Sequence, residues 1–167
     1  MKGVLVVRVG RCTACKTCEL ACAVEHSASK NLLGAIAEEP APSSRVSVEK
    51  GPGFVAPLQC RQCVDAPCVV VCPTKALYRS GPDSPVVIDH ELCVGCRSCV
   101  LACPFGVIRM DRYSQAIIKC DQCAARLERG ELPACVSACP AQALEFKSLD
   151  TVTGQKKMAY LLAIEHS

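Results

Sequence analysis

The sequence predicts an α+β fold in which short strands and short helices surround four repeated groups of cysteines. Sixteen cysteines in a chain of 167 residues fall into four groups of four, and short β-prone segments flank these groups. The chain has no Trp, three Phe and three Tyr, so large side chains alone give a thin core. We therefore expect another agent to organise the interior, as metal does in other cysteine-rich folds.

The four groups share a short-range repeat and differ in the length of one loop. Their members are Cys12, Cys15, Cys18 and Cys22; Cys60, Cys63, Cys68 and Cys72; Cys93, Cys96, Cys99 and Cys103; and Cys120, Cys123, Cys135 and Cys139. Proline follows the last cysteine of the second, third and fourth groups, whereas Ala23 follows Cys22 in the first. Since Ala23 can continue a helix, we expect a helical turn over residues 21–25.

The segments between the groups indicate further elements. Strands are expected over residues 3–9, 86–89, 107–110 and 143–146, each next to a cysteine group. Residues 29–39 are predicted to form a short helix that ends before two prolines. A hairpin is predicted over residues 46–58, because Gly and Pro supply the turn. Residues 148–167 form a tail with a terminal helix or strand that docks on the body or on a partner.

The spacing of the third group is typical of a [4Fe–4S] ligand run. In C-x2-C-x2-C-x3-C-P, three thiolates wrap one cube, and the fourth ligates the other cluster of a pair. The proline removes an N–H donor and fixes the exit of the chain from the site. The second and fourth groups have longer loops but keep the x3-C-P ending, and a longer loop adds little closure entropy. The sequence therefore predicts iron–sulfur clusters.

Two other uses of sixteen cysteines are open at this point. A disulfide framework would need the same even number, but the repeated Cys-Pro ending argues against it. Structural zinc also uses C-x2-C pairs, but zinc ribbons have no need for triplets with a distant fourth cysteine. The cluster interpretation is favoured over both.

Charge and hydropathy exclude other classes of function. The formal charge of +3 counts thiols as neutral, and loading with clusters of about −2 each would make the protein mildly acidic. The chain has no extended basic run with interleaved aromatic residues, so no nucleic-acid partner is expected. It shows no signal peptide and no apolar stretch long enough for a membrane span. We expect a cytoplasmic protein, where thiols stay reduced.

Residues beside the cysteines have two interpretations each. His26 could ligate or gate a cluster, but sixteen cysteines already satisfy four cubes, so a surface or capping role is favoured. Four basic residues within or beside the cysteine loops could raise a cluster potential or simply form a solvated face. These residues are Lys16, Arg61, Lys75 and Arg97.

The four groups in this order resemble the four-cluster iron–sulfur subunits of the dimethyl sulfoxide reductase and formate dehydrogenase type. Each β-prone segment with its cysteine group also resembles half of a bacterial two-cluster ferredoxin. The run CKTCELACAVEHSASKNL, followed by SRVSVEKG, is most similar to the members associated with carbon monoxide dehydrogenase. The resemblance covers residues 2–147, but the chain departs from membrane-anchored relatives in lacking a C-terminal membrane helix.

This resemblance implies a fold and a ligand exchange. It implies one tetra-cluster domain over residues 1–147, built from two pseudo-symmetric ferredoxin-like halves: residues 1–28 with 112–147, and residues 59–111. Residues 29–58 form an insert with the β-hairpin, and residues 148–167 a partner-contacting tail. The four [4Fe–4S] clusters would be held by Cys12, Cys15, Cys18 and Cys139 (cluster 1); Cys120, Cys123, Cys135 and Cys22 (cluster 2); Cys60, Cys63, Cys68 and Cys103 (cluster 3); and Cys93, Cys96, Cys99 and Cys72 (cluster 4).

The resemblance also implies a function in anaerobic metabolism. We expect a non-catalytic subunit that relays single electrons between a catalytic oxidoreductase and a hydrogenase, ferredoxin or flavin partner. The catalytic partner would be a carbon monoxide dehydrogenase, a tungsten aldehyde oxidoreductase or a formate dehydrogenase. The sequence shows no nucleotide loop and no activated nucleophile of its own. A free-standing polyferredoxin carrier is the alternative, a structural zinc module is less favoured, and copies could stack into a longer cluster chain.

Overall fold

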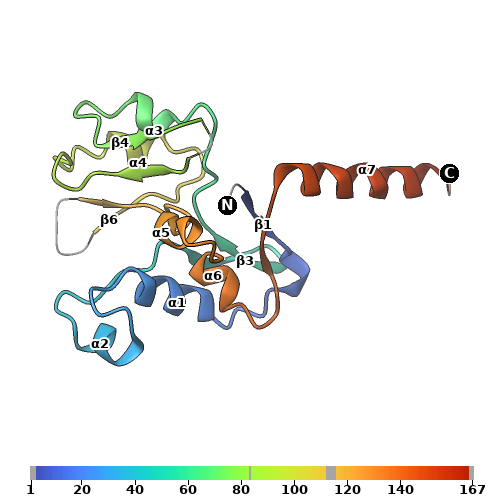
Figure 1. The fold of residues 1–167 in the computed structure, drawn as a ribbon, viewed down its shortest axis with the longest axis horizontal. Helices are drawn as coiled ribbons and strands as arrows, with labels where there is room; N and C mark the ends of the chain where they lie inside the picture. Colours follow the sequence, from blue (N-terminus) through green and yellow to red (C-terminus); the bar gives the residue numbers. More distant parts are fainter. Residues whose placement is uncertain (1–2, 83, 112–115, 166–167) are drawn as a thin grey trace.

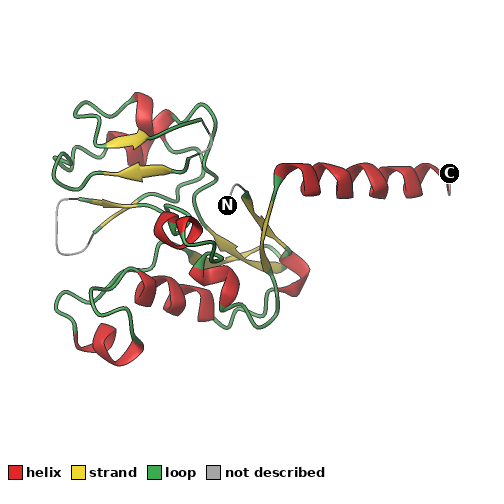
Figure 2. Cartoon of the chain, viewed as in Figure 1, coloured by secondary structure: helices red, strands yellow, loops and turns green. Residues whose placement is uncertain are grey.

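The computed structural model describes residues 3–82, 84–111 and 116–165, which form small two-stranded sheets and short helices (Figures 1 and 2). The strands are β1 (Val4–Val7), β2 (Ser47–Gly51), β3 (Phe54–Leu58), β4 (Leu77–Arg79), β5 (Val86–Ile88), β6 (Arg109–Met110), β7 (Ile117–Ile118) and β8 (Leu144–Lys147). The helices are α1 (Thr17–Glu25), α2 (Leu32–Ala37), α3 (Pro67–Val70), α4 (Ser98–Ala102), α5 (Ala124–Glu128), α6 (Ala134–Ser137) and α7 (Leu149–Glu165), with a 3-10 turn η1 (Val9–Arg11). The predicted α+β class is confirmed.

One lobe, which we call lobe A, is built from β1, β8, α1 and α6. β1 pairs antiparallel with β8 in the register Val4↔Lys147 to Val7↔Leu144, so segments from the two ends of the body lie side by side. α1 packs against α6 beside this sheet. The buried residues of this lobe are Cys18, Cys22, Val46, Cys135 and Leu144.

A second lobe, lobe B, repeats this arrangement with β4, β5, α3 and α4. β4 pairs antiparallel with β5 from Leu77↔Ile88 to Arg79↔Val86, and α3 packs against α4. Its buried residues are Ala66, Cys68, Leu77, Val86, Cys99, Ile108 and Ile117. Cysteines thus form part of the buried core of both lobes.

The strand pair β6–β7 crosses the boundary predicted between the two halves. Arg109 pairs with Ile118 and Met110 with Ile117. Ile117 is 1% exposed and packs in the core of lobe B, although the predicted boundary assigns residues 112–147 to the other half. The chain thus contributes to lobe B as far as β7. Residues 112–115, like 1–2, 83 and 166–167, lie outside the described residues.

The segment between Cys22 and Cys60 contains α2 and the hairpin β2–β3. The hairpin pairs Ser47 with Leu58 and Gly51 with Phe54, and Gly53 in its turn has a φ of +82°. α2 is shorter than the helix predicted over residues 29–39. It begins after Asn31, whose side chain accepts a hydrogen bond from the Gly34 amide at 2.8 Å. This cap fixes the start of the helix within the predicted range.

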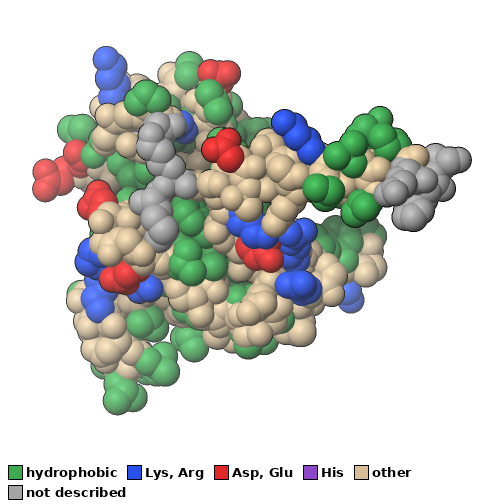
Figure 3. Space-filling model, turned by 45° about the vertical axis from the view of Figure 1, so that its right-hand side comes forward, with side chains coloured by type: hydrophobic (Ala, Val, Ile, Leu, Met, Phe, Trp, Pro, Cys, Tyr) green, Lys and Arg blue, Asp and Glu red, His purple; other side chains and the backbone are tan. Residues whose placement is uncertain are grey.

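The tail forms α7, a helix of 17 residues that projects from the body (Figure 1). Its first turn is capped by Ser148, whose Oγ accepts from the Thr151 amide at 3.2 Å. Large apolar side chains along it are more than half exposed, and Figure 3 shows hydrophobic side chains on this projection. They are Leu149, Met158, Tyr160, Leu161, Leu162 and Ile164. Of the predicted alternatives for the tail, the structure has a helix.

Candidate metal centre

Three cavities in the structure are each lined by four cysteine thiols. In each cavity three thiols come from one cysteine group and the fourth comes from the end of another. The cavities are small and similar, each about 20 Å³. Their thiols are Cys12, Cys15, Cys18 and Cys139; Cys60, Cys63, Cys68 and Cys103; and Cys93, Cys96, Cys99 and Cys72. Each cavity therefore gathers the thiols of one predicted ligand set.

The other four cysteines, Cys22, Cys120, Cys123 and Cys135, are all buried. Burial raises the pKa of Cys135, and the charges of Cys120, Cys22 and Cys123 raise it further. Burial also raises the pKa of Cys120 to about 12 and that of Cys123 to about 11. Since thiolates are the form that binds metal, Cys120, Cys123 and Cys135 need a cation beside them to ionise at neutral pH.

The loops of the first and third cysteine groups share one backbone conformation. Lys16 and Arg97 each lie between the second and third cysteines of their group, with φ of 59° and 66°. Each is the residue before a helix, α1 and α4 respectively. A left-handed residue other than Gly is uncommon, and the repeat of one at the same place indicates that the two loops wrap their cavities alike.

The second and fourth groups have a left-handed residue two positions after the first cysteine, as the first and third groups do at Ala14 and Gly95. Gln62 and Gln122 follow the first cysteine of each group by two residues, with φ of 51° and 58°. Their backbone N–H groups donate to the Sγ of Cys60 and of Cys120, both at 3.4 Å. Such N–H···S contacts stabilise negative charge on sulfur, which is a known lever on cluster potential.

The four basic residues that the sequence placed in or beside these loops are all exposed to solvent. They are Lys16, Arg61, Lys75 and Arg97. Their position fits the solvated alternative better than a role in tuning a cluster, because water and salt screen an exposed charge.

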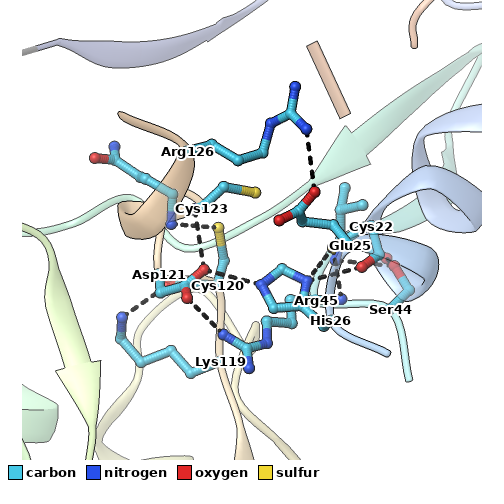
Figure 4. Close-up of polar contacts among 12 residues, drawn as sticks. Cys22, Glu25, His26, Ser44, Arg45, Lys119, Cys120, Asp121, Cys123 and Arg126 are labelled. Atoms are coloured by element: carbon cyan, nitrogen blue, oxygen red, sulfur yellow. Dashed lines mark hydrogen bonds and ion pairs between the residues drawn. The ribbon is translucent and has the colours of Figure 1, made fainter. Parts of the chain in front are cut away.

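His26 connects two cysteine groups through a polar network (Figure 4). Its Nε2 lies 3.2 Å from Oδ1 of Asp121, and its Nδ1 lies 2.7 Å from the carbonyl oxygen of Cys22. Arg45 completes the network, since its guanidinium is 2.8 Å from Oδ2 of Asp121 and its backbone N–H donates to the Sγ of Cys22 at 3.2 Å. His26 thus caps α1 and holds Asp121 in place.

The network shifts both of its titrating groups towards their charged forms. Burial alone would lower the pKa of His26, but hydrogen bonds to Asp121 and Cys22 raise it to about 9. Burial would raise the pKa of Asp121, yet the hydrogen bond from His26 and the charge of Arg45 hold it below its ordinary value. His26, Asp121 and Cys123 also place ligand atoms within 4.8 Å of one another. Because both ring nitrogens of His26 have protein partners, we assign it the capping role.

The donor set fits iron–sulfur clusters. All sixteen cysteines are free thiols, so the structure contains no disulfide framework among them. Gln59, which precedes Cys60, is 3% exposed, and neither its Nε2 nor its Oε1 has a hydrogen-bond partner among the described residues. A buried amide without partners is unfavourable, and its Nε2 offers an N–H donor next to a predicted ligand.

Sequence reasoning missed two cationic residues of the site. Arg45 belongs to the segment between the first two cysteine groups, and no local pattern links it to Asp121. Lys119 directly precedes Cys120 and is buried. Its position next to a predicted ligand was the one available signal.

Known proteins share these motifs. The family profile described as a 4Fe–4S dicluster domain matches residues 53–149, and one described as a 4Fe–4S binding domain matches residues 10–25. No helix in the described part of the chain is long and apolar enough to cross a bilayer.

Three curated relatives are similar over most of the chain. An iron-sulfur protein of Rhodospirillum rubrum is 40% identical, with 83% of this chain and 78% of that protein covered. The B subunit of anaerobic dimethyl sulfoxide reductase of Escherichia coli (strain K12) is 34% identical, over 92% and 76%. The thiosulfate reductase electron transfer subunit PhsB of Salmonella typhi is 39% identical, over 84% and 72%.

Proposed function

Because the chain belongs to the 4Fe–4S dicluster family and is a non-catalytic iron–sulfur subunit of the dimethyl sulfoxide reductase type, we propose that it relays single electrons through four [4Fe–4S] clusters. The observation that carries this proposal is the set of three similar cavities, each lined by four thiols from two cysteine groups. When bound, the clusters supply one-electron chemistry, and the chain supplies ligands, burial and hydrogen bonds.

In this proposal each cluster takes three ligands from one cysteine group and its fourth ligand from another group. The three cavities hold clusters 1, 3 and 4, and the buried set Cys22, Cys120, Cys123 and Cys135 holds cluster 2. Clusters 1 and 2 belong to one ferredoxin-like half and clusters 3 and 4 to the other. The shared loop conformations of Lys16 with Arg97, and of Gln62 with Gln122, support this pseudo-symmetry.

Contacts between the ligand sets support a linear order from cluster 1 to cluster 4. Cys18 and Cys135 lie in the same buried core of lobe A, which connects the first two sets. The Gln62 side chain donates to the Cys120 carbonyl at 2.9 Å, which connects the middle two. Cys68 and Cys99 lie in the same buried core of lobe B, which connects the last two.

The exposed ligand cysteines belong to the terminal sets. Cys15 of cluster 1 and Cys96 of cluster 4 are exposed, whereas every ligand of cluster 2 is buried and those of cluster 3 are buried or half-buried. Two redox partners could therefore exchange electrons with the chain, one at each end.

We propose that one partner is a catalytic oxidoreductase and the other a second redox protein. The relatives named as reductase subunits support the first assignment. The run from Cys15 to Leu32 favours carbon monoxide dehydrogenase over a tungsten aldehyde oxidoreductase or formate dehydrogenase, and a hydrogenase, ferredoxin or flavin protein is the second partner. Reduced thiols favour a cytoplasmic location. A free carrier, or copies stacked end to end, are the alternatives that a partner search must address.

A ligand substitution tests the exchange. We expect Cys22→Ser to remove the cluster of the Cys120 set, and the matched control Cys15→Ser to remove cluster 1. Iron and sulfide analysis of anaerobically purified protein, with EPR spectra of the reduced state, measures both. If Cys22→Ser and Cys15→Ser remove the same cluster, the exchange is wrong. Zinc in place of iron and sulfide would contradict the whole proposal.

Anaerobic pull-down from the native host identifies the partners. Recovery of a carbon monoxide dehydrogenase supports the favoured branch, and recovery of an aldehyde or formate enzyme overturns it. A monodisperse chain that loads all four clusters and binds no oxidoreductase would favour the free carrier.

A further inference from the structure

The side chain of Lys119 is buried where the two middle ligand sets meet. It is 2% exposed and follows directly after β7. Its Nζ donates to the carbonyl oxygen of Val86 at 2.6 Å and to that of Cys120 at 2.8 Å. Figure 4 shows Lys119 beside Cys120.

Within the described part of the chain, no carboxylate forms an ion pair with this ammonium. The adjacent carboxylate, Asp121, is instead bound by His26 and Arg45. Carbonyl oxygens satisfy hydrogen bonds but do not neutralise a charge, and a buried cation without a counter-charge is unfavourable. The fold therefore needs a negative charge near Lys119 that the protein side chains do not supply.

Lys119 faces both middle ligand sets. It lines the cavity of Cys60, Cys63, Cys68 and Cys103. The same cavity contains Cys68, and the Lys119 ammonium donates to the carbonyl oxygen of Cys120 at 2.8 Å. Cys68 belongs to the set of cluster 3 and Cys120 to that of cluster 2.

We propose that Lys119 is the shared counter-ion of clusters 2 and 3 and raises the reduction potentials of both. The inference rests on the proposed four-cluster relay. An oxidised cubane with four thiolates carries about −2, and reduction adds one electron without making or breaking a bond. A fixed positive charge in a low-dielectric interior stabilises that electron. Lys119 thus makes the inner pair of clusters easier to reduce than it would be without this ammonium.

Two substitutions separate the charge of Lys119 from its hydrogen bonds. Lys119→Met removes both, and Lys119→Gln keeps a side-chain N–H donor but removes the charge. Lys157→Met on the exposed helix α7 is the matched control, because it changes the net charge by the same amount away from the ligand sets. Each protein is purified anaerobically, analysed for iron and sulfide, and titrated against potential with EPR detection.

We expect two of the four potentials to become more negative in both Lys119 variants, while the other two and all four of Lys157→Met stay at wild-type values. Unchanged potentials in Lys119→Met, or an equal shift of all four, would overturn the inference. Wild-type potentials in Lys119→Gln would also overturn it, because they would assign the effect to hydrogen bonding.

The relay and the counter-ion can fail separately. If the wild-type protein lacks four clusters, the relay fails; if it has them and Lys119→Met shifts no potential, only the counter-ion fails. If Lys119→Met and Lys119→Gln do not load clusters, the Lys119→Arg variant, which keeps the charge, is tested for cluster loading. Full loading with Arg shows that the site requires the charge, whereas an equal loading failure shows that it requires the shape of lysine and contradicts our inference.

Discussion

At the scale of single residues, His26 and Asp121 join two cysteine groups that are far apart in the chain. The contact links positions separated by 95 residues and brings the end of α1 against the loop that contains Cys120 and Cys123. Arg45 adds a third segment to the same point. Because the three side chains lie next to predicted ligands of cluster 2, they hold that ligand set together from outside.

We predict that His26→Gln loosens cluster 2 in a pH-dependent way. The pKa of His26 is raised from 6.5 to about 9 in the folded chain, so its stabilising effect is complete below about pH 6.5 and is lost as the pH rises through 9. Asp121 has a lowered pKa, so its contribution is present above its ordinary value of 3.8 and is lost on acidification. We expect a cost of about 1–2 kcal/mol for the variant near pH 6.

The measurement is the rate of iron release to a chelator under anaerobic conditions. The variant should release iron faster than wild type at pH 6, and the two rates should converge above pH 9. A ratio of rates that is the same at pH 6 and pH 9.5 would show that the charge of His26 does not matter.

The residues of this network show where sequence reasoning stops. The cysteine groups could be identified because ligand spacing is local and repeats four times. Arg45 and Lys119 could not be assigned, since their contacts with Asp121 and Val86 depend on how distant segments pack. A capping role for His26 could be inferred, because the residue follows Cys22 by one helical turn.

At the scale of elements, strands were easier to predict than their pairing. β1, β5, β6 and β8 lie within the ranges predicted from β-prone residues or overlap them. The pairing of β6 with β7 was not predicted, because two-residue strands leave no periodic pattern. The packing of Ile117 in the core of lobe B also depends on contacts that are distant in sequence. α2 is shorter than predicted, since the Asn31 cap is decided by local hydrogen bonds rather than by apolar spacing.

We predict that deletion of residues 149–167 removes partner binding and leaves the clusters in place. None of the described side chains of α7 belongs to the buried core of either lobe or lines one of the three thiol-lined cavities. Its exposed apolar side chains are a typical feature of a segment that a partner covers. Iron content and visible absorption should match wild type, while anaerobic pull-down should recover no oxidoreductase.

A matched variant separates the helix from its apolar surface. Replacement of Leu161 and Leu162 by Ser keeps the chain length and should weaken partner recovery to a similar extent. Loss of iron in the deletion variant would instead show that α7 stabilises the body, and full partner recovery would place the interface elsewhere.

At the scale of the whole molecule, the buried cores contain several of the proposed cluster ligands. Cys18, Cys22 and Cys135 are buried in lobe A, and Cys68 and Cys99 in lobe B. The largest fully buried side chains include Leu77 and Ile117 but, among the described residues, no aromatic one. Because apolar burial contributes about 25 cal/mol per Å², the small buried apolar side chains of the described residues give only a limited hydrophobic stabilisation. Folding and cluster binding are expected to be one coupled reaction.

We therefore predict that removal of iron unfolds both lobes together. Chelation under anaerobic, reducing conditions should abolish the protection of backbone amides in two strand pairs, β1 with β8 in lobe A and β4 with β5 in lobe B. This loss should proceed at the same rate as the loss of cluster absorption. The physical reason is that thiols with raised pKa values, such as Cys120 at about 12, lose the cation that kept them as buried thiolates and leave an under-packed core. Hydrogen exchange followed by mass spectrometry measures the two lobes in one experiment.

Addition of iron, sulfide and thiol should restore protection in both. If β4–β5 stays protected after all iron has left, lobe B is stable by apolar packing alone and the coupling is confined to lobe A.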